Sequence, residues 1–293
     1  MKKRWLITGA GGQLGREFVN VLDGVEEFAA FKSAELDITN SKLLENTINS
    51  IKPTHILNCA AWTNVEKAEE NNSEVFEVNA HGVGNLASIA KRLGIHLTHF
   101  STDYVFDGQK NTPYETDDLK NPLSVYGLSK SYGEDAIKDI NPKGALIIRT
   151  SWLYSVYGSN FVRTMLRLER ERESISVIDD QVGQPTSAAD LAKFVVEIVS
   201  QSDLVGTFHA SNSGSASWYD FAGMIFELNG KDPARVLPIK SSQYPQVAKR
   251  PSYSVLSLDK WRSVGIPTMQ SWQEALLKTF QFDHQKREFF GEN

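Results

Sequence analysis

The 293-residue sequence predicts an α/β fold in which a doubly wound parallel sheet carries a smaller, mixed C-terminal region. Three observations support this prediction. Short apolar runs alternate with amphipathic stretches through the first half, a glycine-rich turn follows the first apolar run, and the alternation becomes irregular after about residue 151. Alternation at this spacing is typical of a parallel sheet covered by helices on both faces.

The elements predicted in the first half are strands separated by helices. The strands span residues 4–10, 27–31, 55–61, 96–102 and 145–151, and the helices span residues 13–22, 40–51, 70–93 and 125–138. Ligands of such sheets bind at the carboxyl ends of the strands, so the residues that follow each apolar run are the first candidates for a site.

The first glycine-rich turn lies in the segment LITGAGGQLGREF, between a strand and a helix. Glycines there allow a tight turn, the close approach of a diphosphate and close packing of helix on strand, while the helix N-terminus faces the anion. The spacing Gly-x-x-Gly-x-x-Gly directly after the first strand predicts Rossmann-type dinucleotide binding. The residues expected to contact the dinucleotide are Gly9, Gly12, Gln13, Leu14 and Gly15.

The end of the second strand bears on the choice of cofactor. An acidic residue about twenty positions after the glycines binds the ribose hydroxyls of NAD, and a basic residue accommodates the extra phosphate of NADP. Lys32 stands where the acid would be, which favours NADPH, although a lysine that is simply solvated leaves NADH open. Asp37 and Ile38, in the segment LDIT, are expected near the adenine.

The third strand ends in the segment NCAAWTNVEKAE, which is rich in small residues. Ala60 and Ala61 would let the backbone approach a cofactor, and Thr63 and Val65 would project above the sheet toward a substrate. Asn79 is a polar residue on an otherwise apolar helix, so we expect it to be either a cofactor contact or a satisfied buried amide.

The fourth strand ends at Thr102, whose hydroxyl can bind a substrate carbonyl, and Asp103 and Tyr104 follow it. His96 and His99 lie three residues apart in this strand, so they point to opposite faces and do not form a metal pair. No cluster of cysteine, histidine or carboxylate residues elsewhere in the sequence predicts a catalytic metal.

Tyr126 and Lys130 lie four residues apart on a predicted helix, so their side chains are expected on one face. A free tyrosine has a pKa of about 10 and is a weak acid at neutral pH. A nearby ammonium would lower that pKa, and the tyrosine could give its proton to a carbonyl oxygen while a hydride reaches the carbon. Lys130 would also bind the nicotinamide ribose. Together with Thr102, the pair predicts a reductase.

The change in alternation after residue 151 suggests two parts. We predict a dinucleotide-binding domain over residues 1–151, to which a helix at 188–200 returns. A substrate-binding region would take residues 152–187 and 201–281, and a polar, loose tail would take residues 282–293. Within the second part, helical spacing is expected over 161–173, 217–230 and 271–280.

Composition excludes several classes of protein. Hydrophobic residues make up 41% and charged residues 23% of the chain, as in soluble globular proteins. A net charge of −5 gives no electrostatic reason to expect a nucleic-acid partner. A single cysteine, Cys59, rules out an internal disulfide framework and fits the cytoplasm, and no apolar run is long enough for a leader core or a membrane span.

The motifs together resemble the extended short-chain dehydrogenase/reductase family, through TGAGGQLG, NCAA, STD and YGLSK. Within it, the sequence is similar to the dTDP-4-dehydrorhamnose reductase subgroup, through NCAAWTNVEKAE, STDYVFDG, NPLSVYGLSK, DDQVGQPT and RPSYSVL, and the resemblance covers roughly residues 6–256. It implies reduction of the C4 keto group of dTDP-4-dehydro-L-rhamnose to dTDP-L-rhamnose, in nucleotide-sugar biosynthesis for cell-surface polysaccharide.

The resemblance also implies roles for particular residues. Its catalytic residues would be Thr102, Tyr126 and Lys130, and its substrate contacts would be Thr63, Val65, Asp103, Tyr104, Trp152, Asn160 and Arg250. Some members hold Mg²⁺ at a dimer contact made by acidic residues. This chain keeps Glu17 but has Ala189 where an acidic partner is expected, which argues against a Mg²⁺ bridge. A homodimer without the metal is still compatible with the sequence.

Alternative functions stay open beside this one. Related sugar-nucleotide 4,6-dehydratases carry an acidic pair after the threonine, whereas Tyr104 follows Asp103 here, which favours plain ketoreduction. A reductase of another 4-keto-deoxysugar nucleotide would differ only in the shape of its pocket. A non-catalytic, dinucleotide-binding regulatory subunit is the remaining alternative, and the complete set of Thr102, Tyr126 and Lys130 speaks against it.

Overall fold

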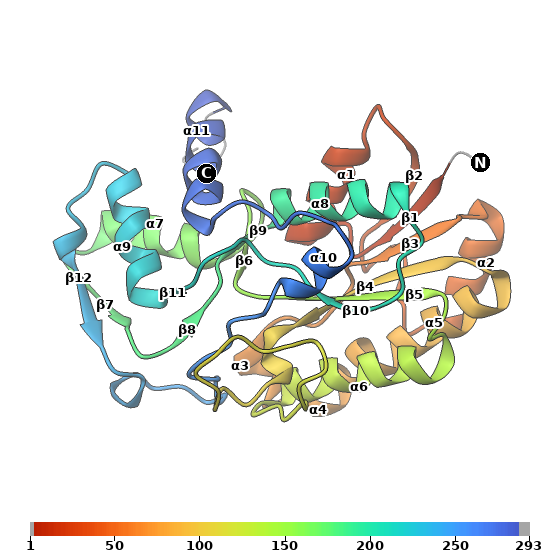
Figure 1. The fold of residues 1–293 in the computed structure, drawn as a ribbon, viewed down its shortest axis with the longest axis horizontal. Helices are drawn as coiled ribbons and strands as arrows, with labels where there is room; N and C mark the ends of the chain where they lie inside the picture. The colour runs from red at the N-terminus through yellow and green to blue at the C-terminus, as the bar shows by residue number, and fades with distance from the viewer. Residues whose placement is uncertain (1–2, 287–293) are drawn as a thin grey trace.

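The computed structural model describes residues 3–286 and contains a six-stranded parallel sheet with the strand order β10-β5-β4-β3-β1-β2 (Figure 1). From β1 the chain moves outward to β2 and then crosses back to β3, so the switch point of the sheet lies beside β1. This is the doubly wound, Rossmann-type arrangement that the sequence predicts. The strands are β1 Arg4–Thr8, β2 Glu27–Phe31, β3 His55–Asn58, β4 His96–Thr102, β5 Ala145–Thr150 and β10 Gly206–His209.

Helices cover both faces of the sheet, as Figure 1 shows for α1 and α8 on one side and α5 and α6 on the other. Every residue of β3, β4 and β5 is buried, as expected for strands covered on both sides. One apolar core forms under α1 Gln13–Leu22 and α8 Ala188–Gln201, and a second forms under α2 Ser41–Ile51, α5 Gly82–Leu93 and α6 Val125–Ile140.

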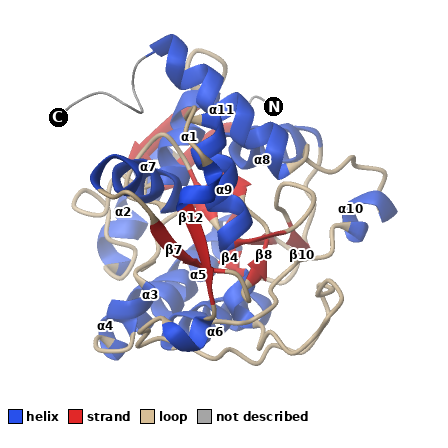
Figure 2. Ribbon diagram, turned by 90° about the vertical axis from the view of Figure 1, so that its left-hand side faces the viewer, coloured by secondary structure: helices blue, strands red, loops and turns tan. Residues whose placement is uncertain are grey.

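A smaller unit lies beyond one end of the main sheet, where Figures 1 and 2 show α7, α9, β7 and β12 together. It has its own apolar core, which includes Phe221 and Leu276, and its two-stranded sheets pair β7 with β12, β8 with β11 and β6 with β9. Its elements are β6 Leu153–Tyr154, α7 Phe161–Glu171, β7 Ile175–Ile178, β8 Val182–Gly183, β9 Thr186–Ser187, β11 Ala216–Ser217, α9 Trp218–Leu228, β12 Val236–Ile239 and α11 Trp272–Lys286.

Short elements complete the described chain. They are α3 Val65–Ala68, α4 Asn72–Phe76, α10 Asp259–Ser263, the π-helical turn η1 Glu77–His81 and the 3₁₀ turns η2 Asp103–Val105, η3 Pro233–Arg235 and η4 Ser241–Gln243. None of the helices within residues 3–286 is both long and apolar enough to cross a bilayer.

The helix predicted over residues 70–93 is divided into α4, η1 and α5. The π-helical turn contains Asn79, whose side chain bonds to the backbone of Trp62. Such wide turns often occur next to functional sites.

The C-terminal region also differs from the prediction in two places. Residues 206–209 fall within the predicted substrate region of 201–281, but they form β10 and pair with β5 at the edge of the main sheet. Trp261 of α10 packs on Phe208 of this strand, so that segment also joins the main core. In the predicted tail of 282–293, α11 continues to Lys286, and residues 287–293 lie outside the described residues.

Candidate active site

The turn after β1 brings three backbone segments close together. Gly9 has a φ of +67°, and a Cβ there would lie 2.6 Å from Ala60 N. A Cβ on Gly15 would lie 2.4 Å from Gly9 O. These distances give two of the predicted glycines a steric reason, because backbone atoms leave no room for a side chain.

The N-terminus of α1 suits a diphosphate. Its N-cap is Gly12, which has no side chain to bond the first amides of the helix. Uncapped amides and the positive end of the helix dipole favour an anion at this place. Leu14 packs into the core and Gln13 Oε1 accepts a bond from Asn160 Nδ2, so both residues would meet a cofactor through their backbone.

The segment after β2 lies beside the glycine turn. The exposed side chain of Lys32 passes Gly11 so closely that a Cβ on Gly11 would lie 3.4 Å from Lys32 Cγ. Asp37 is exposed and accepts bonds from the amide and hydroxyl of Thr39. Ile38 is buried, and a Cβ on Gly82 would lie 2.7 Å from its Cγ1. Lys32 is therefore placed where a phosphate beside the turn would meet it.

The turn after β3 is held by two buried amides. Ala60 N donates to Asn58 Oδ1 at 3.2 Å. Asn79 Oδ1 accepts from Trp62 N at 2.9 Å, while Asn79 Nδ2 donates to Trp62 O and to Ser129 Oγ. Of the two expectations for Asn79, the structure shows the satisfied buried amide. It ties the turn after β3 to α6.

Thr102 and Tyr126 meet at the carboxyl end of β4, as the sequence predicts. The Tyr126 hydroxyl lies near enough to Thr102 for that side chain to act on its pKa. Thr102 Oγ1 accepts from Tyr104 N at 3.2 Å and donates to Asp103 Oδ1 at 3.0 Å. Tyr104 packs edge-on against Tyr126, with ring centroids 5.7 Å apart. The hydroxyls of Thr102 and Tyr126 therefore lie together above the carboxyl edge of the sheet.

Burial raises the pKa of Tyr126 to about 12, although the bond with Thr102 opposes this and the Asp103 charge adds to it. Burial also raises the pKa of Asp103 to about 6, against the hydrogen bonds from Ser254 and Thr102. Tyr126 is therefore protonated at neutral pH, as a proton donor must be.

The expectation that Lys130 lowers the pKa of Tyr126 is wrong for this arrangement. Lys130 is 2% exposed, and its Nζ donates to Phe100 O at 2.6 Å and lies 3.3 Å from His99 Nε2. Spacing along α6 correctly places both residues on one face, but the long lysine side chain reaches down to β4. Burial lowers the pKa of Lys130 to about 8, and the charge of Glu134 only partly opposes this.

Arg250 reaches the same edge from a loop far away in the sequence. Its Nη2 lies 2.5 Å from Glu66 Oε1 and its Nη1 donates to Gln246 at 2.6 Å. Its guanidinium is also near enough to Tyr104 to oppose the rise that burial causes in the pKa of that hydroxyl. Glu66 Oε2 also accepts from Val247 N at 3.0 Å and from Ala248 N at 3.2 Å. Burial would raise the pKa of Glu66, but these bonds and the guanidinium lower it below its usual range.

Three further predicted substrate contacts differ in how firmly they are held. Thr63 is exposed and Val65 is half-buried at the start of α3. Trp152 has a φ of +45° and stacks on Trp218, with ring centroids 3.5 Å apart and planes 6° apart. A Cβ on Gly183 would lie 2.5 Å from the Trp152 ring, so the ring is held on two sides.

Asn160 and Glu17 connect α1 to the segment after β6. Asn160 caps α7 by accepting from Arg163 N, and it donates to Gln13 Oε1 at 3.0 Å and to Ser155 O at 2.7 Å. Glu17 is buried, accepts from Ser155 Oγ at 2.5 Å, and burial raises its pKa. Within residues 3–286, no three His, Cys, Asp or Glu side chains gather as a metal site requires.

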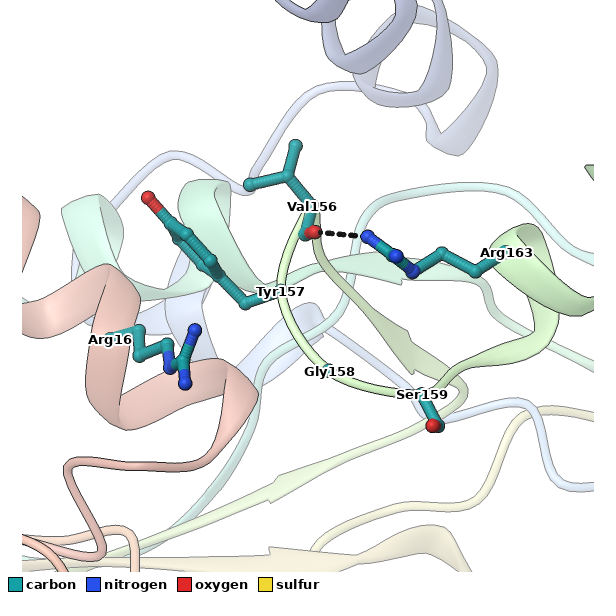
Figure 3. Close-up of a pocket in the computed structure, with 6 residues that line it drawn as sticks. All are labelled: Arg16, Val156, Tyr157, Gly158, Ser159 and Arg163. Carbon is teal, nitrogen blue, oxygen red and sulfur yellow. Dashed lines mark hydrogen bonds between the residues drawn. The ribbon is translucent and has the colours of Figure 1, made fainter. Parts of the chain in front are cut away.

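A surface pocket of about 460 Å³ lies between α1 and the loop 156–159 (Figure 3). Arg16 lies 5.4 Å from the centre of the Tyr157 ring, and Arg163 Nη1 donates to Val156 O at 2.9 Å. The pocket lining is Arg16, Val156, Tyr157, Gly158, Ser159 and Arg163. None of the catalytic candidates is among them, so we locate the chemistry by the hydrogen bonds around Thr102 rather than by this pocket.

A buried ion pair under α6 was missed by sequence reasoning. Arg149 donates from Nε and Nη2 to the two oxygens of Glu134 at 2.8 and 2.7 Å, and Ser101 Oγ donates at 2.6 Å. Burial would raise the pKa of Glu134, but Arg149, Ser101 and Lys120 lower it to about 2. The available signal was a lone arginine in the apolar run ALIIRTS, with a glutamate one turn after Lys130.

Comparisons with known proteins cover almost the whole chain. The RmlD substrate binding domain family model matches residues 3–284. A dTDP-4-keto-6-deoxy-D-glucose reductase of Streptomyces niveus is 43% identical over 96% of this chain and 97% of its own length. A dTDP-4-dehydrorhamnose reductase of Aggregatibacter actinomycetemcomitans is 42% identical over 93% of this chain and 97% of its own.

Among solved structures, the crystal structure of dTDP-4-dehydrorhamnose reductase from Bacillus anthracis in complex with NADP is similar with a TM-score of 0.93. It is 40% identical to this chain and covers 96% of it, and all of that structure is matched. The similarity therefore includes the smaller C-terminal unit as well as the main sheet.

Proposed function

The chain belongs to the RmlD substrate binding domain family, and from that premise we propose that it reduces the C4 keto group of dTDP-4-dehydro-L-rhamnose to dTDP-L-rhamnose. The observation that carries the proposal is the placement of the Tyr126 hydroxyl beside Thr102, which ends β4 and is bonded to Asp103 and Tyr104. Relatives named as dTDP-4-dehydrorhamnose reductases support the choice of sugar.

In the proposed reaction, Tyr126 gives its hydroxyl proton to the C4 oxygen, and Thr102 holds that oxygen in place. A nicotinamide cofactor supplies the hydride to C4 when it is bound. Because burial holds the pKa of Tyr126 at about 12, the hydroxyl keeps its proton at neutral pH until an alkoxide forms beside it. Lys130 would bind the nicotinamide ribose after its side chain turns away from Phe100.

We propose NADPH as the preferred cofactor. The support is Lys32 beside Gly11, together with the NADP bound by the Bacillus anthracis reductase. Other proposed cofactor contacts are Gly9, Gly12, Gln13, Leu14, Gly15, Asp37, Ile38, Ala60 and Ala61. Asn79 acts on the same site through Trp62 and Ser129.

On the substrate side, we propose that Arg250 binds the diphosphate, because its forked donors suit an anion of this shape. Further proposed contacts are Thr63, Val65, Asp103, Tyr104, Trp152 and Asn160. The division into a dinucleotide-binding domain and a substrate region, the cytoplasmic location and a homodimer also stay predictions from the sequence.

A second candidate is the reduction of another 4-keto-deoxysugar nucleotide, which the Streptomyces niveus relative favours because it is named for dTDP-4-keto-6-deoxy-D-glucose. The regulatory-subunit alternative finds less support, since Tyr126 lies beside Thr102 at the end of β4 and Lys130 contacts the same strand.

The test is the oxidation of NADPH and NADH with dTDP-4-dehydro-L-rhamnose, followed by nicotinamide absorbance, with dTDP-4-keto-6-deoxy-D-glucose as the comparison substrate. We expect faster turnover with the rhamnose precursor and with NADPH. Faster turnover of the comparison sugar would move the assignment to the second candidate. Tight NADPH binding without turnover of either sugar would leave the regulatory subunit.

A further inference from the structure

His99 is a buried histidine that touches the proposed catalytic lysine. It lies in the middle of β4, is 0% exposed, and pairs in register with Asn58 of β3. Its Nδ1 lies 2.9 Å from Asn58 Nδ2, and its Nε2 lies 3.3 Å from Lys130 Nζ. Each ring nitrogen therefore faces another nitrogen atom. The positions of the protons on Asn58, His99 and Lys130 decide which of these atoms donate.

The orientation of the Asn58 amide is settled by its other partners. Asn58 Oδ1 accepts from Ala60 N at 3.2 Å and from Thr8 Oγ1 at 2.7 Å. A backbone amide can only donate, so the oxygen of Asn58 must face Ala60. Asn58 Nδ2 then faces His99 and donates to Nδ1. In a neutral ring, the proton is consequently on Nε2, the nitrogen that faces Lys130.

An ammonium on Lys130 does not fit this arrangement, since two donors would face each other. An uncharged amine fits it, because its lone pair accepts from His99 Nε2 while one of its hydrogens is donated to Phe100 O at 2.6 Å. We propose that His99 is a positioning residue that donates to Lys130 Nζ and holds the uncharged amine form of this side chain against β4 before the cofactor binds.

The surroundings of Lys130 agree with this. The titratable groups that face it are His99 of β4, Glu134 of α6 and Cys59 after β3, with Tyr126 one turn away on its own helix. Burial keeps the pKa of His99 well below its usual range and raises that of Cys59, so both are neutral. Glu134 is ionised but is already bonded by Arg149 and Ser101.

The inference rests on the proposed function, in which Lys130 binds the nicotinamide ribose as an ammonium. Moving from the arrangement against β4 to the ribose then requires one proton from solvent, which joins the amine lone pair. Binding of NADPH should therefore take up a proton where the amine form is populated, because the pKa of Lys130 is about 8 before binding and higher after it.

Calorimetry of NADPH binding in two buffers of different ionisation enthalpy measures this uptake. At about pH 8.5 we expect the wild type to take up about half a proton or more, and at about pH 6.5 almost none. His99→Gln should reduce the uptake at the higher pH by more than about half, because a freely oriented amide can turn its oxygen to the ammonium.

The matched control is His96→Gln. His96 is buried in the same strand, but its Nε2 bonds to Leu204 O at 2.8 Å and it does not face Lys130. The His96→Gln variant should take up as many protons on NADPH binding as the wild type does. Equal uptake in the wild type and His99→Gln, or no uptake in the wild type, would overturn the inference.

A measurement on the unaltered protein covers the case in which His99→Gln does not fold. Two-bond ¹⁵N–¹H NMR of the ring distinguishes the tautomers, and we expect His99 to be neutral with its proton on Nε2. A proton on Nδ1, or an imidazolium, would overturn the inference. Turnover of the sugar nucleotide by the wild type is measured separately, so failure of the proposed function is distinguished from failure of this inference.

Discussion

In the cofactor half of the candidate site, functional positions follow from backbone geometry, whereas in the substrate half they follow from side-chain partners far away in the sequence. Gly9 and Gly15 are needed because backbone atoms lie within 2.6 Å of where their Cβ would be. Arg250, by contrast, is held by Glu66, which is 184 positions earlier in the chain. Trp152 is likewise held by Trp218.

The difference explains where sequence patterns suffice. A backbone constraint appears in the sequence as a residue type at a fixed spacing, so a glycine motif predicts its own structure. A side-chain partner appears only when the fold brings two distant segments together. We therefore expect changes in the cofactor half to act through steric strain, and changes in the substrate half to act through small losses of orientation.

The largest effect is expected at Tyr126, where the two halves meet. Tyr126→Phe removes the proton donor alone, so kcat should fall by about 10²–10⁴-fold while the Kd for NADPH stays nearly unchanged. Turnover is measured by NADPH oxidation and Kd by calorimetry. Tyr132→Phe is the matched control, since the same atom is removed from an exposed ring on the same helix. Equal losses in the two variants would sink the assignment of Tyr126.

The next effect tests the backbone constraint. Gly15→Ala places a methyl group 2.4 Å from Gly9 O and 2.7 Å from Ala10 Cα, and overpacking of this kind costs about 1–3 kcal/mol. The free energy of unfolding should fall by this amount in denaturant titrations, and NADPH binding should weaken. A variant as stable as the wild type, with unchanged NADPH binding, would contradict the steric account.

Gly223→Ala is the control for this substitution. Gly223 lies inside α9, and its Cβ would meet nothing within 4 Å. Replacing an unobstructed helical glycine by alanine should stabilise the protein by about 0.5–1 kcal/mol, so the two variants are expected to change stability in opposite directions.

Much of the fold was predictable, because strand–helix alternation reports burial on both faces of a parallel sheet. The bounds of β4 and α1 agree with the predicted residues 96–102 and 13–22. What was not predictable depended on neighbours. The run containing residues 206–209 carries no signal for the sheet that it joins, and the π-helical turn at Asn79 is set by the backbone of Trp62.

The placement of the candidate site residues was predictable in part. Thr102 and Tyr126 lie close together because one ends a strand and the other begins the helix that packs beside it. The direction taken by the Lys130 side chain was not, since four rotatable bonds allow it to reach either Tyr126 or β4. The carbonyl of Phe100 and the ring of His99 decide between these choices only in the folded chain.

The smallest effect tests the substrate half through Glu66, which holds Arg250 and the amides of residues 247 and 248. Glu66→Gln keeps the size of the side chain but removes its charge. The pair is partly exposed, and solvent-screened pairs contribute about 0.2–1 kcal/mol. We expect KM for the sugar nucleotide to rise about 2–5-fold. The kcat and the Kd for NADPH should stay nearly unchanged. Glu70→Gln, an exposed glutamate four residues on, is the control.

The pH dependence of the same pair sharpens the comparison. Because folding lowers the pKa of Glu66, its contribution to stability is fully present above its unfolded pKa of about 4.3 and is lost as pH falls through the lower folded value. The difference in unfolding free energy between the wild type and Glu66→Gln should therefore be constant near neutral pH and disappear in acid. Two results would contradict this account: a stability difference that grew in acid, or a KM that was unaffected at neutral pH. Arg250 would then be held by Tyr104 and the loop backbone. Backbone geometry would determine its position, as it does in the cofactor half.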